Sequence, residues 1–145
     1  MRKTRHGLLG ALLFSCTCAL AGAARAELAV IANPDVKLVG ISTQELKDIY
    51  LGRARTLPDG SAVELFDQPA DSAAYAQFAR DVLGLDVQAL KSYRAKLMFT
   101  GKARLPQVFD TDEAVKRAVA GNPRGLGYVQ GRHVDASVKV LLILP

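Results

Sequence analysis

The side chains best suited to chemistry in this sequence are basic groups that could hold an anion. They fall in two segments: Arg53 and Arg55 in the first, and Thr100, Gly101, Lys102 and Arg104 in the second. Arginine can hold a phosphate or a carboxylate through two parallel hydrogen bonds. A threonine hydroxyl adds a donor, and a glycine allows the backbone to approach closely. If the two segments adjoin, they form a positive site for an oxyanion; the alternative is that these charges are solvated on loops.

Ser72 is a second candidate ligand for an anion, because it lies where a helix is expected to start. The first N–H groups of a helix have no partner within the helix and carry partial positive charge. They could bind an anion with the help of the Ser72 hydroxyl. The alternative, which we favour, is that Asp71 caps this helix and occupies the same N–H groups.

Catalytic and metal-binding chemistry has little support in the sequence. His133 is the one histidine after position 26, and no nucleophile is tied to it by spacing, so we interpret it as a surface residue rather than a general base. Asp110, Asp112 and Glu113 could suggest a cation site, but acidic residues also favour the first turn of a helix. Phosphate-loop, dinucleotide-binding and hydrolase motifs are absent. We therefore expect no enzyme activity, no metal and no cofactor.

The first 26 residues have the pattern of a secretory signal peptide. A basic start precedes an apolar stretch over residues 8–22, and small residues follow up to Ala26. The apolar stretch is shorter than the roughly 20 residues that a membrane span needs. We predict cleavage after Ala26 and export to a bacterial periplasm. The alternatives are a retained membrane anchor and a lipoprotein lipidated at Cys16.

Removing this segment changes the chemistry of the remaining 119 residues, a length that suits one domain over residues 27–145. Both cysteines lie in the predicted signal peptide, which excludes a disulfide or a thiolate site in the rest of the chain. Four basic residues lie there too, which leaves 15 Lys and Arg against 14 Asp and Glu. This balance gives no support to nucleic acid binding, which needs a strongly basic face. We expect no membrane span after cleavage.

The pattern of apolar residues in the first half predicts two strands around a helix. Residues 28–32 are continuously apolar, as in a buried strand. Ser42 and Glu45 have the spacing of a capping box, and Gly52 is placed to end the helix that follows. After a turn, residues 62–67 predict the second strand.

The second half predicts three helices and then two strands. We expect helices capped by Asp71, Asp86 and Asp110. Their inward-facing residues include Tyr75, Phe78, Leu90, Tyr93, Leu97, Met98, Val115 and Val119. Strands are expected at 126–130 and 138–144; the last is apolar on both faces, so we expect it at the centre of the sheet. This order predicts an α/β fold, a mixed sheet with helices on both faces.

Three segments together resemble a known family. They are LKDIYLGRARTLPDG (46–60), YRAKLMFTGKARLP (93–106) and NPRGLGYVQ (122–130). These segments are similar in order and spacing to one lobe of the substrate-binding proteins of phosphate ABC transporters, over roughly residues 28–144. The resemblance implies a single lobe of the type 2 periplasmic binding protein fold.

The resemblance also implies a function. We expect a periplasmic solute-binding protein that binds phosphate or another small oxyanion, in connection with an ABC transporter or with sensing. The alternative is a protein-interaction module that keeps the lobe fold without a small-molecule site, with another envelope protein as its partner.

The sequence departs from the family at the expected anion site. The family has an Arg-Ser-Asp-Gly-Ser-Gly-Thr stretch after the second strand, and the matching stretch here is Asp67 to Ala73. Asp67 stands in the place of the arginine, while Asp71 and Ala73 replace a serine and a threonine. The resemblance therefore implies that this stretch has lost phosphate binding of the family type, with Ser72 left as a weak anion ligand.

Overall fold

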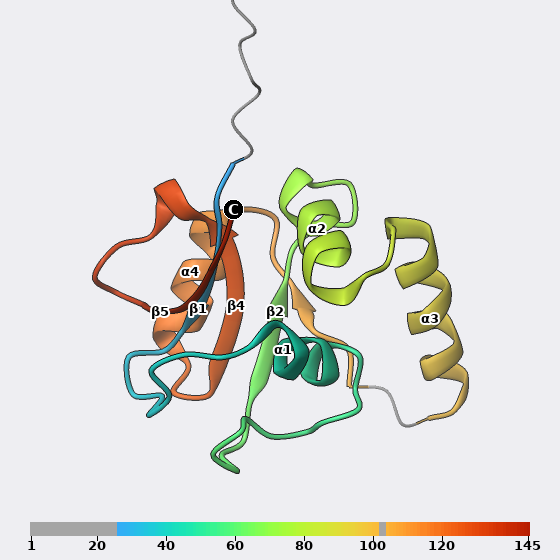
Figure 1. Ribbon diagram of the computed structural model, residues 1–145, viewed down its shortest axis with the longest axis horizontal. Coiled ribbons are helices and arrows are strands. Elements are labelled where there is room, and N and C mark those ends of the chain that lie inside the picture. Colours follow the sequence, from blue (N-terminus) through green and yellow to red (C-terminus); the bar gives the residue numbers. More distant parts are fainter. Residues whose placement is uncertain (1–25, 102–103) are drawn as a thin grey trace, which may run out of the picture.

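The computed structural model, described here over residues 26–101 and 104–145, forms a five-stranded mixed sheet covered by helices on both faces (Figure 1). The strands are β1 (Leu28–Ala32), β2 (Glu64–Asp67), β3 (Gln107–Val108), β4 (Gly125–Gln130) and β5 (Lys139–Leu144). Their order across the sheet is β3-β2-β4-β1-β5. Strand β2 is parallel to β3 and β4, whereas β1 is antiparallel to β4 and β5. The predicted α/β class is confirmed, and the rest of the predicted signal peptide before Ala26 lies outside the described residues.

The helices divide between the two faces of the sheet. They are α1 (Thr43–Tyr50), α2 (Ala73–Phe78) with its π-helical continuation η1 (Ala79–Leu83), α3 (Val87–Phe99) and α4 (Asp112–Gly121). Helices α1, α2 and η1 pack on one face and α4 packs on the other. Helix α3 packs outside η1, away from the sheet (Figure 1). None of the helices in the described part of the chain has the length and apolar character required to cross a membrane.

Strand β1 is the centre of the core. All five of its residues are completely buried, because alternate side chains enter the two apolar clusters on opposite faces of the sheet. Leu28, Val30 and Ala32 join the cluster under α1 and α2. Ala29 and Ile31 join the cluster under α4. The continuous apolar run therefore predicted a strand that is buried on both faces.

The helix starts confirm some predicted caps and correct others. The capping box of Ser42 and Glu45 is formed, and Asp86 caps α3. Asp71 was expected to cap α2, but Ser72 does so, accepting a hydrogen bond from the Tyr75 N–H at 3.1 Å. The cap falls one residue later because a turn, with the Ser72 N–H bonded to the Pro69 carbonyl, precedes the helix.

The start of α4 is shifted in the same way. Thr111, rather than the expected Asp110, caps this helix by accepting a hydrogen bond from the Ala114 N–H. Aspartate and threonine are both good caps, so neighbouring cap residues leave the sequence ambiguous by one position.

Two burial expectations are wrong. Strand β5 lies at an edge of the sheet, outside β1, rather than at its centre; its Ile143 is 46% exposed. Met98, expected to face inward, is 62% exposed; α3 contacts the rest of the described structure through η1 and through the side chains of Tyr93 and Arg94. Strand β2 is also shorter than predicted, and Ala62 forms only an isolated bridge with Thr56.

The glycines of β4 let α4 lie close to the sheet. A Cβ at Gly125 would come within 3.0 Å of the Asn122 carbonyl oxygen and of Val119 Cα. These are backbone atoms, which cannot move aside by changing a rotamer. The tight packing of α4 on β4 therefore requires glycine at this position.

We predict that Gly125→Ala lowers the free energy of unfolding by about 1–3 kcal/mol, because the added methyl overpacks this contact. Gly121→Ala is the control, since a Cβ there has no neighbour within 4 Å. Urea denaturation of both variants checks this. Equal stability of the two variants would contradict the packing argument.

Candidate functional site

The carboxyl ends of the parallel strands β2, β3 and β4 meet at one end of the sheet, where α/β folds commonly bind ligands. Here this end holds a buried carboxylate. Asp67, the last residue of β2, is 1% exposed, and its Oδ2 lies 2.8 Å from Nη1 of Arg94 on α3. Its Oδ1 accepts hydrogen bonds from the Tyr128 hydroxyl and from the Gln68 N–H. Asp67 therefore pairs with groups of the chain itself.

Aromatic rings surround this ion pair. The Arg94 guanidinium lies 5.7 Å from the ring centre of Tyr75 and donates to its hydroxyl at 3.4 Å. Burial, and after it the negative charge of Asp67, raises the pKa of Tyr128 well above its ordinary value. The same two causes raise the pKa of Tyr50. Both phenols therefore stay protonated at neutral pH, and Tyr128 remains a hydrogen-bond donor to Asp67.

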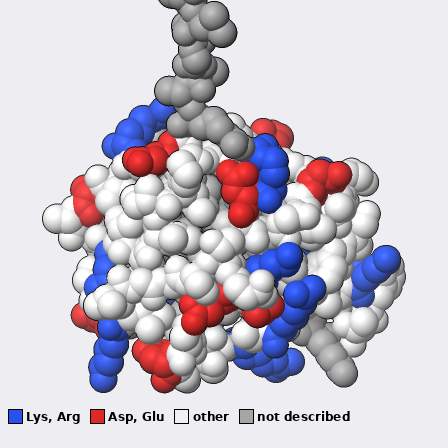
Figure 2. Space-filling model, in the orientation of Figure 1, with Lys and Arg blue, Asp and Glu red and all other residues white. Residues whose placement is uncertain are grey.

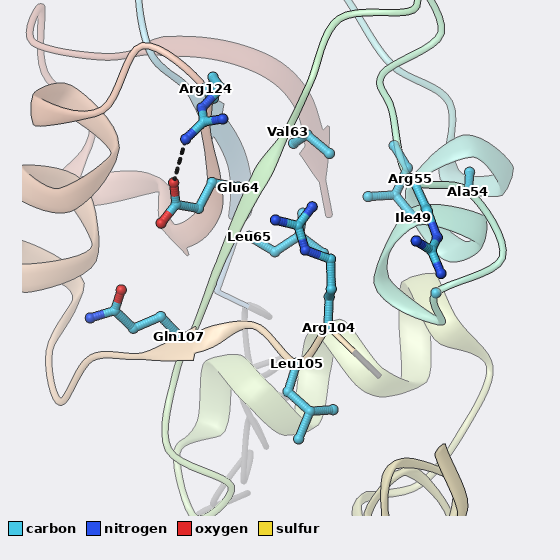
Figure 3. Close-up of a pocket in the computed structure, with 11 residues that line it drawn as sticks. Ile49, Ala54, Arg55, Val63, Glu64, Leu65, Arg104, Leu105, Gln107 and Arg124 are labelled. Atoms are coloured by element: carbon cyan, nitrogen blue, oxygen red, sulfur yellow. Dashed lines mark ion pairs between the residues drawn. The ribbon is translucent and has the colours of Figure 1, made fainter. Parts of the chain in front are cut away.

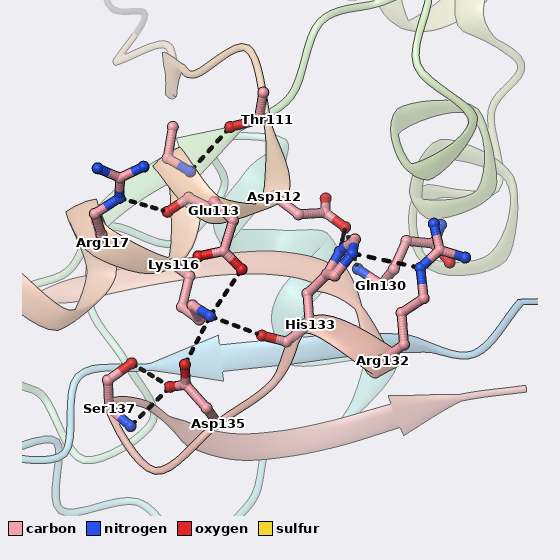
Figure 4. A network of polar contacts seen from close by, with 11 residues as sticks. Thr111, Asp112, Glu113, Lys116, Arg117, Gln130, Arg132, His133, Asp135 and Ser137 are labelled. Carbon is pink, nitrogen blue, oxygen red and sulfur yellow. Dashed lines mark hydrogen bonds and ion pairs between the residues drawn. The ribbon is translucent and has the colours of Figure 1, made fainter.

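A second carboxylate at this end is also satisfied internally (Figure 4). Asp112, the first residue of α4, accepts hydrogen bonds from the Gln68 side chain and from the Gln130 N–H. Its Oδ2 lies 2.6 Å from Nδ1 of His133. His133, expected on the surface in the turn at 131–133, lies in a 3₁₀ turn there with its side chain 35% exposed, and it is also hydrogen-bonded to Asp112.

Lys116 of α4 forms hydrogen bonds and ion pairs with the same turn after β4. Its ammonium lies 2.7 Å from Asp135 and 2.9 Å from Glu113, and it donates to the His133 carbonyl at 3.1 Å (Figure 4). The hydrogen bond from Lys116 holds the pKa of Asp135 well below its usual range. Glu113 and Asp112 are therefore used in contacts with neighbouring side chains, which argues against the cation site considered from the sequence.

In these contacts the charged side chains at the carboxyl ends of the strands, the end where Ser72 also lies, bond to one another. The Ser72 hydroxyl caps α2 by accepting a hydrogen bond from the Tyr75 N–H. Asp67, at the start of the same stretch, is paired with Arg94, so residues 67–73 offer no arginine to an anion. The weak anion site at Ser72 stays a prediction.

A pocket with the opposite charge lies at the amino ends of β2, β3 and β4 (Figure 3). Its lining comprises Ile49, Gly52, Ala54, Arg55, Val63, Glu64, Leu65, Arg104, Leu105, Gln107 and Arg124. The three arginines come from the loop after α1, the segment before β3 and the residue before β4. In Figure 2, basic side chains gather on the surface near α1 and the loop that follows it.

The arginines of this pocket differ in their partners. Arg124 lies 3.5 Å from Glu64, which also accepts a hydrogen bond from Asn122 at 2.7 Å. Within the described ranges, neither Arg55 nor Arg104 forms an ion pair with a carboxylate. These two guanidinium groups are therefore available for an anion from solution.

Of the other predicted ligands, those in the described residues lie outside this pocket's lining. Arg53 pairs with Asp48 at 3.5 Å. The Thr100 hydroxyl donates to the Leu97 carbonyl at 2.7 Å, and Gly101 follows it at the end of α3 with a positive φ of 68°. Lys102 lies outside the described residues. Of the two basic segments, Arg55 and Arg104 are the residues that line one pocket together.

Three important residues were missed by sequence reasoning. Arg124 was read only as part of a family motif, although an arginine just before a strand beside β2 could reach the same end of the sheet. Glu64 was read only as part of a strand. Arg94 lies in the middle of a helix, and nothing in its local sequence indicates that it reaches the buried Asp67.

Comparison with known proteins identifies the fold. No protein-family model and no curated protein matches the sequence. Among solved structures, the chain is similar to a protein described as a phosphate ABC transporter substrate-binding protein from Clostridium perfringens, solved with bound phosphate (TM-score 0.62, 19% identity), and to an ABC-type phosphate transport receptor from Vibrio cholerae (TM-score 0.62, 18% identity). PstS from Borrelia burgdorferi is also similar (TM-score 0.57, 15% identity).

These matches cover one part of larger proteins. Each covers 80% of this chain, but only 45% of the Clostridium protein, 46% of the Vibrio protein and 47% of the Borrelia protein. The chain thus spans less than half the length of these structures, which is consistent with a single lobe. The predicted resemblance to one lobe of phosphate ABC transporter substrate-binding proteins is confirmed for the fold.

We predict that Asp67→Asn lowers the free energy of unfolding by about 3–5 kcal/mol, because the Arg94 charge then stays buried without its partner. Urea denaturation measures this loss. Asp71→Asn, on the surface beside α2, is the control and changes stability by less than about 0.5 kcal/mol.

The coupling can be measured with a second variant. In the double variant Asp67→Asn/Arg94→Gln, the loss is smaller than the sum of the two single losses, because the two side chains interact directly. Additive losses would contradict the ion pair.

Proposed function

We propose that the protein is an exported solute-binding protein that holds an oxyanion group between Arg55 and Arg104. The observation that carries this proposal is that both arginines line one pocket without a carboxylate partner among the described residues. An arginine fork matches the oxygens of a phosphate or a carboxylate. Two such groups at one pocket attract and orient an anion better than either group alone.

Phosphate is the first candidate for this oxyanion. The structural neighbours are described as phosphate-binding or phosphate-transport proteins, and one of them contains phosphate. This chain shares only its fold with these proteins, at low sequence identity. The choice of phosphate as the ligand of this chain is therefore part of the proposal. The proposed site differs in position from the stretch at 67–73 that matches the family's anion site. It lies at the amino ends of the strands, whereas Ser72 follows the carboxyl end of β2.

The proposed setting follows from the predicted signal peptide over residues 1–26. The protein works in the periplasm, where it binds its ligand without catalysing a reaction. It delivers the ligand to an ABC transporter, or it signals to another envelope protein that the ligand is bound. The neighbours named as transport receptors and substrate-binding proteins support this setting.

A second candidate function, a protein-interaction module, is favoured by a different observation. Near the end of α3 and at β3, four apolar side chains are exposed: Met98 (62%), Phe99 (92%), Leu105 (43%) and Val108 (54%). Exposed apolar side chains that form one patch commonly mark protein contacts, and this alternative supposes that these four do. Under this alternative the lobe binds another protein. The arginines of the pocket are then solvent-exposed charges that bind no small molecule.

We predict saturable phosphate binding that Arg55→Ala and Arg104→Ala each weaken by about 10- to 100-fold, the range expected for loss of a charge-assisted hydrogen bond. Isothermal titration calorimetry at low ionic strength, with sulfate as a competing oxyanion, measures the effect.

Two variants serve as controls for this measurement. Arg132→Ala removes the same charge at the other end of β4, and Phe99→Ser removes the exposed ring; neither should change the affinity. Equal affinity in Arg55→Ala and the native protein would contradict the proposed site. The absence of heat with both ions at millimolar concentrations would contradict binding of free inorganic oxyanions and favour the interaction module.

A further inference from the structure

We infer that the oxyanion group held by Arg55 and Arg104 belongs to an organic molecule with an apolar body, a phosphate monoester or a carboxylate, and that the apolar wall of the same pocket binds that body. This inference rests on the proposed function, because both use the same two arginines. It adds the chemistry of the uncharged part of the ligand.

The size and lining of the pocket support this inference. Its cavity volume is about 370 Å³, within the range of pockets that hold small organic molecules. The lining is mixed. Beside its charged residues and Gln107 it has apolar side chains from α1, the loop after it, the start of β2 and the segment before β3, namely Ile49, Ala54, Val63, Leu65 and Leu105. The close-up shows these side chains around the same space as the arginines (Figure 3).

The physical chemistry of phosphate itself argues for an added body. A free phosphate ion presents oxygen on every side and needs hydrogen-bond donors or water around it. Against an apolar wall it would lose water without gaining a hydrogen bond, which is unfavourable. An alkyl or aryl group attached to the oxyanion would instead bury apolar area on that wall, which is favourable.

The polar margin of the pocket limits the ligand to one charged end. The carboxylate of Glu64 lies at the β2 side of the pocket, where it is paired with Arg124 and hydrogen-bonded to Asn122. Because Arg124 is used in this pair, a second anionic group on the ligand would find no unpaired arginine there. The lining therefore suits a molecule whose single oxyanion end faces Arg55 and Arg104, with its apolar end away from the charges.

Leu105 offers a test that does not disturb the core. It lines the pocket from the segment before β3 and is 43% exposed, so a polar substitution there leaves the two core clusters unchanged. Val39 is 94% exposed and lies outside the pocket lining. Val39→Ser is therefore the matched control for Leu105→Ser.

We expect phenyl phosphate to bind about tenfold more tightly than inorganic phosphate, and Leu105→Ser to remove most of that difference. Val39→Ser should behave as the native protein does. Calorimetric titrations of the purified protein with phenyl phosphate, inorganic phosphate and phenol measure these affinities, and phenol alone should bind weakly because it lacks the charged group.

The outcomes separate this inference from the proposed function. If neither phosphate compound binds, the proposed function itself fails, and the inference fails with it. If both bind equally well, or if Leu105→Ser leaves the preference for phenyl phosphate intact, only the inference is overturned. If phenol binds as tightly as phenyl phosphate, the ligand does not need its charge, and the inference is likewise overturned.

Discussion

The buried ion pair between Asp67 and Arg94 decides what each end of the sheet can do. The carboxylate is 1% exposed and the guanidinium side chain 14% exposed, with 2.8 Å between their charged atoms. Charges this deeply buried must be paired, since either alone would cost several kcal/mol. The pair ties the end of β2 to α3, and the Tyr128 hydroxyl ties it to β4. The end of the sheet where such folds commonly bind ligands is thus filled by the chain's own groups.

The charged groups at the two ends of the parallel strands differ in whether they have partners. Carboxylates gather at their carboxyl ends, where Asp67 and Asp112 are bonded to neighbouring side chains. Guanidinium groups without carboxylate partners in the described part of the chain lie at the amino ends, where Arg55 and Arg104 line a pocket. The Asp67 carboxylate at the first end is already paired with Arg94, whereas the two guanidinium groups at the second end can attract an anion. The lobe shares its fold with the solved phosphate-binding proteins, and the site that we propose for a ligand lies at the other end of the sheet.

The sequence predicts best what is decided locally. The capping box of Ser42 and Glu45 depends on residues three apart, and the buried strand β1 depends on five successive apolar residues, so both were predictable. That Arg55 and Arg104 line the same pocket could be predicted only if the two segments adjoin, because it depends on how two loops meet. The contact between Arg94 and Asp67 was not predictable, since a helix face and a strand end carry no local signal of each other. For the same reason, β5 has the composition of a central strand but lies at the edge.

The most direct test of this account is to map where phosphate binds by amide chemical shifts in a titration followed by nuclear magnetic resonance. The account predicts that the shifted amides lie around the amino-end pocket, at Arg55, Leu65, Arg104 and Arg124, and that those at the start of α2 do not move. Shifts concentrated at residues 72–75 would contradict it. They would place the anion at the carboxyl end of β2, where Asp67 and Arg94 pair with each other.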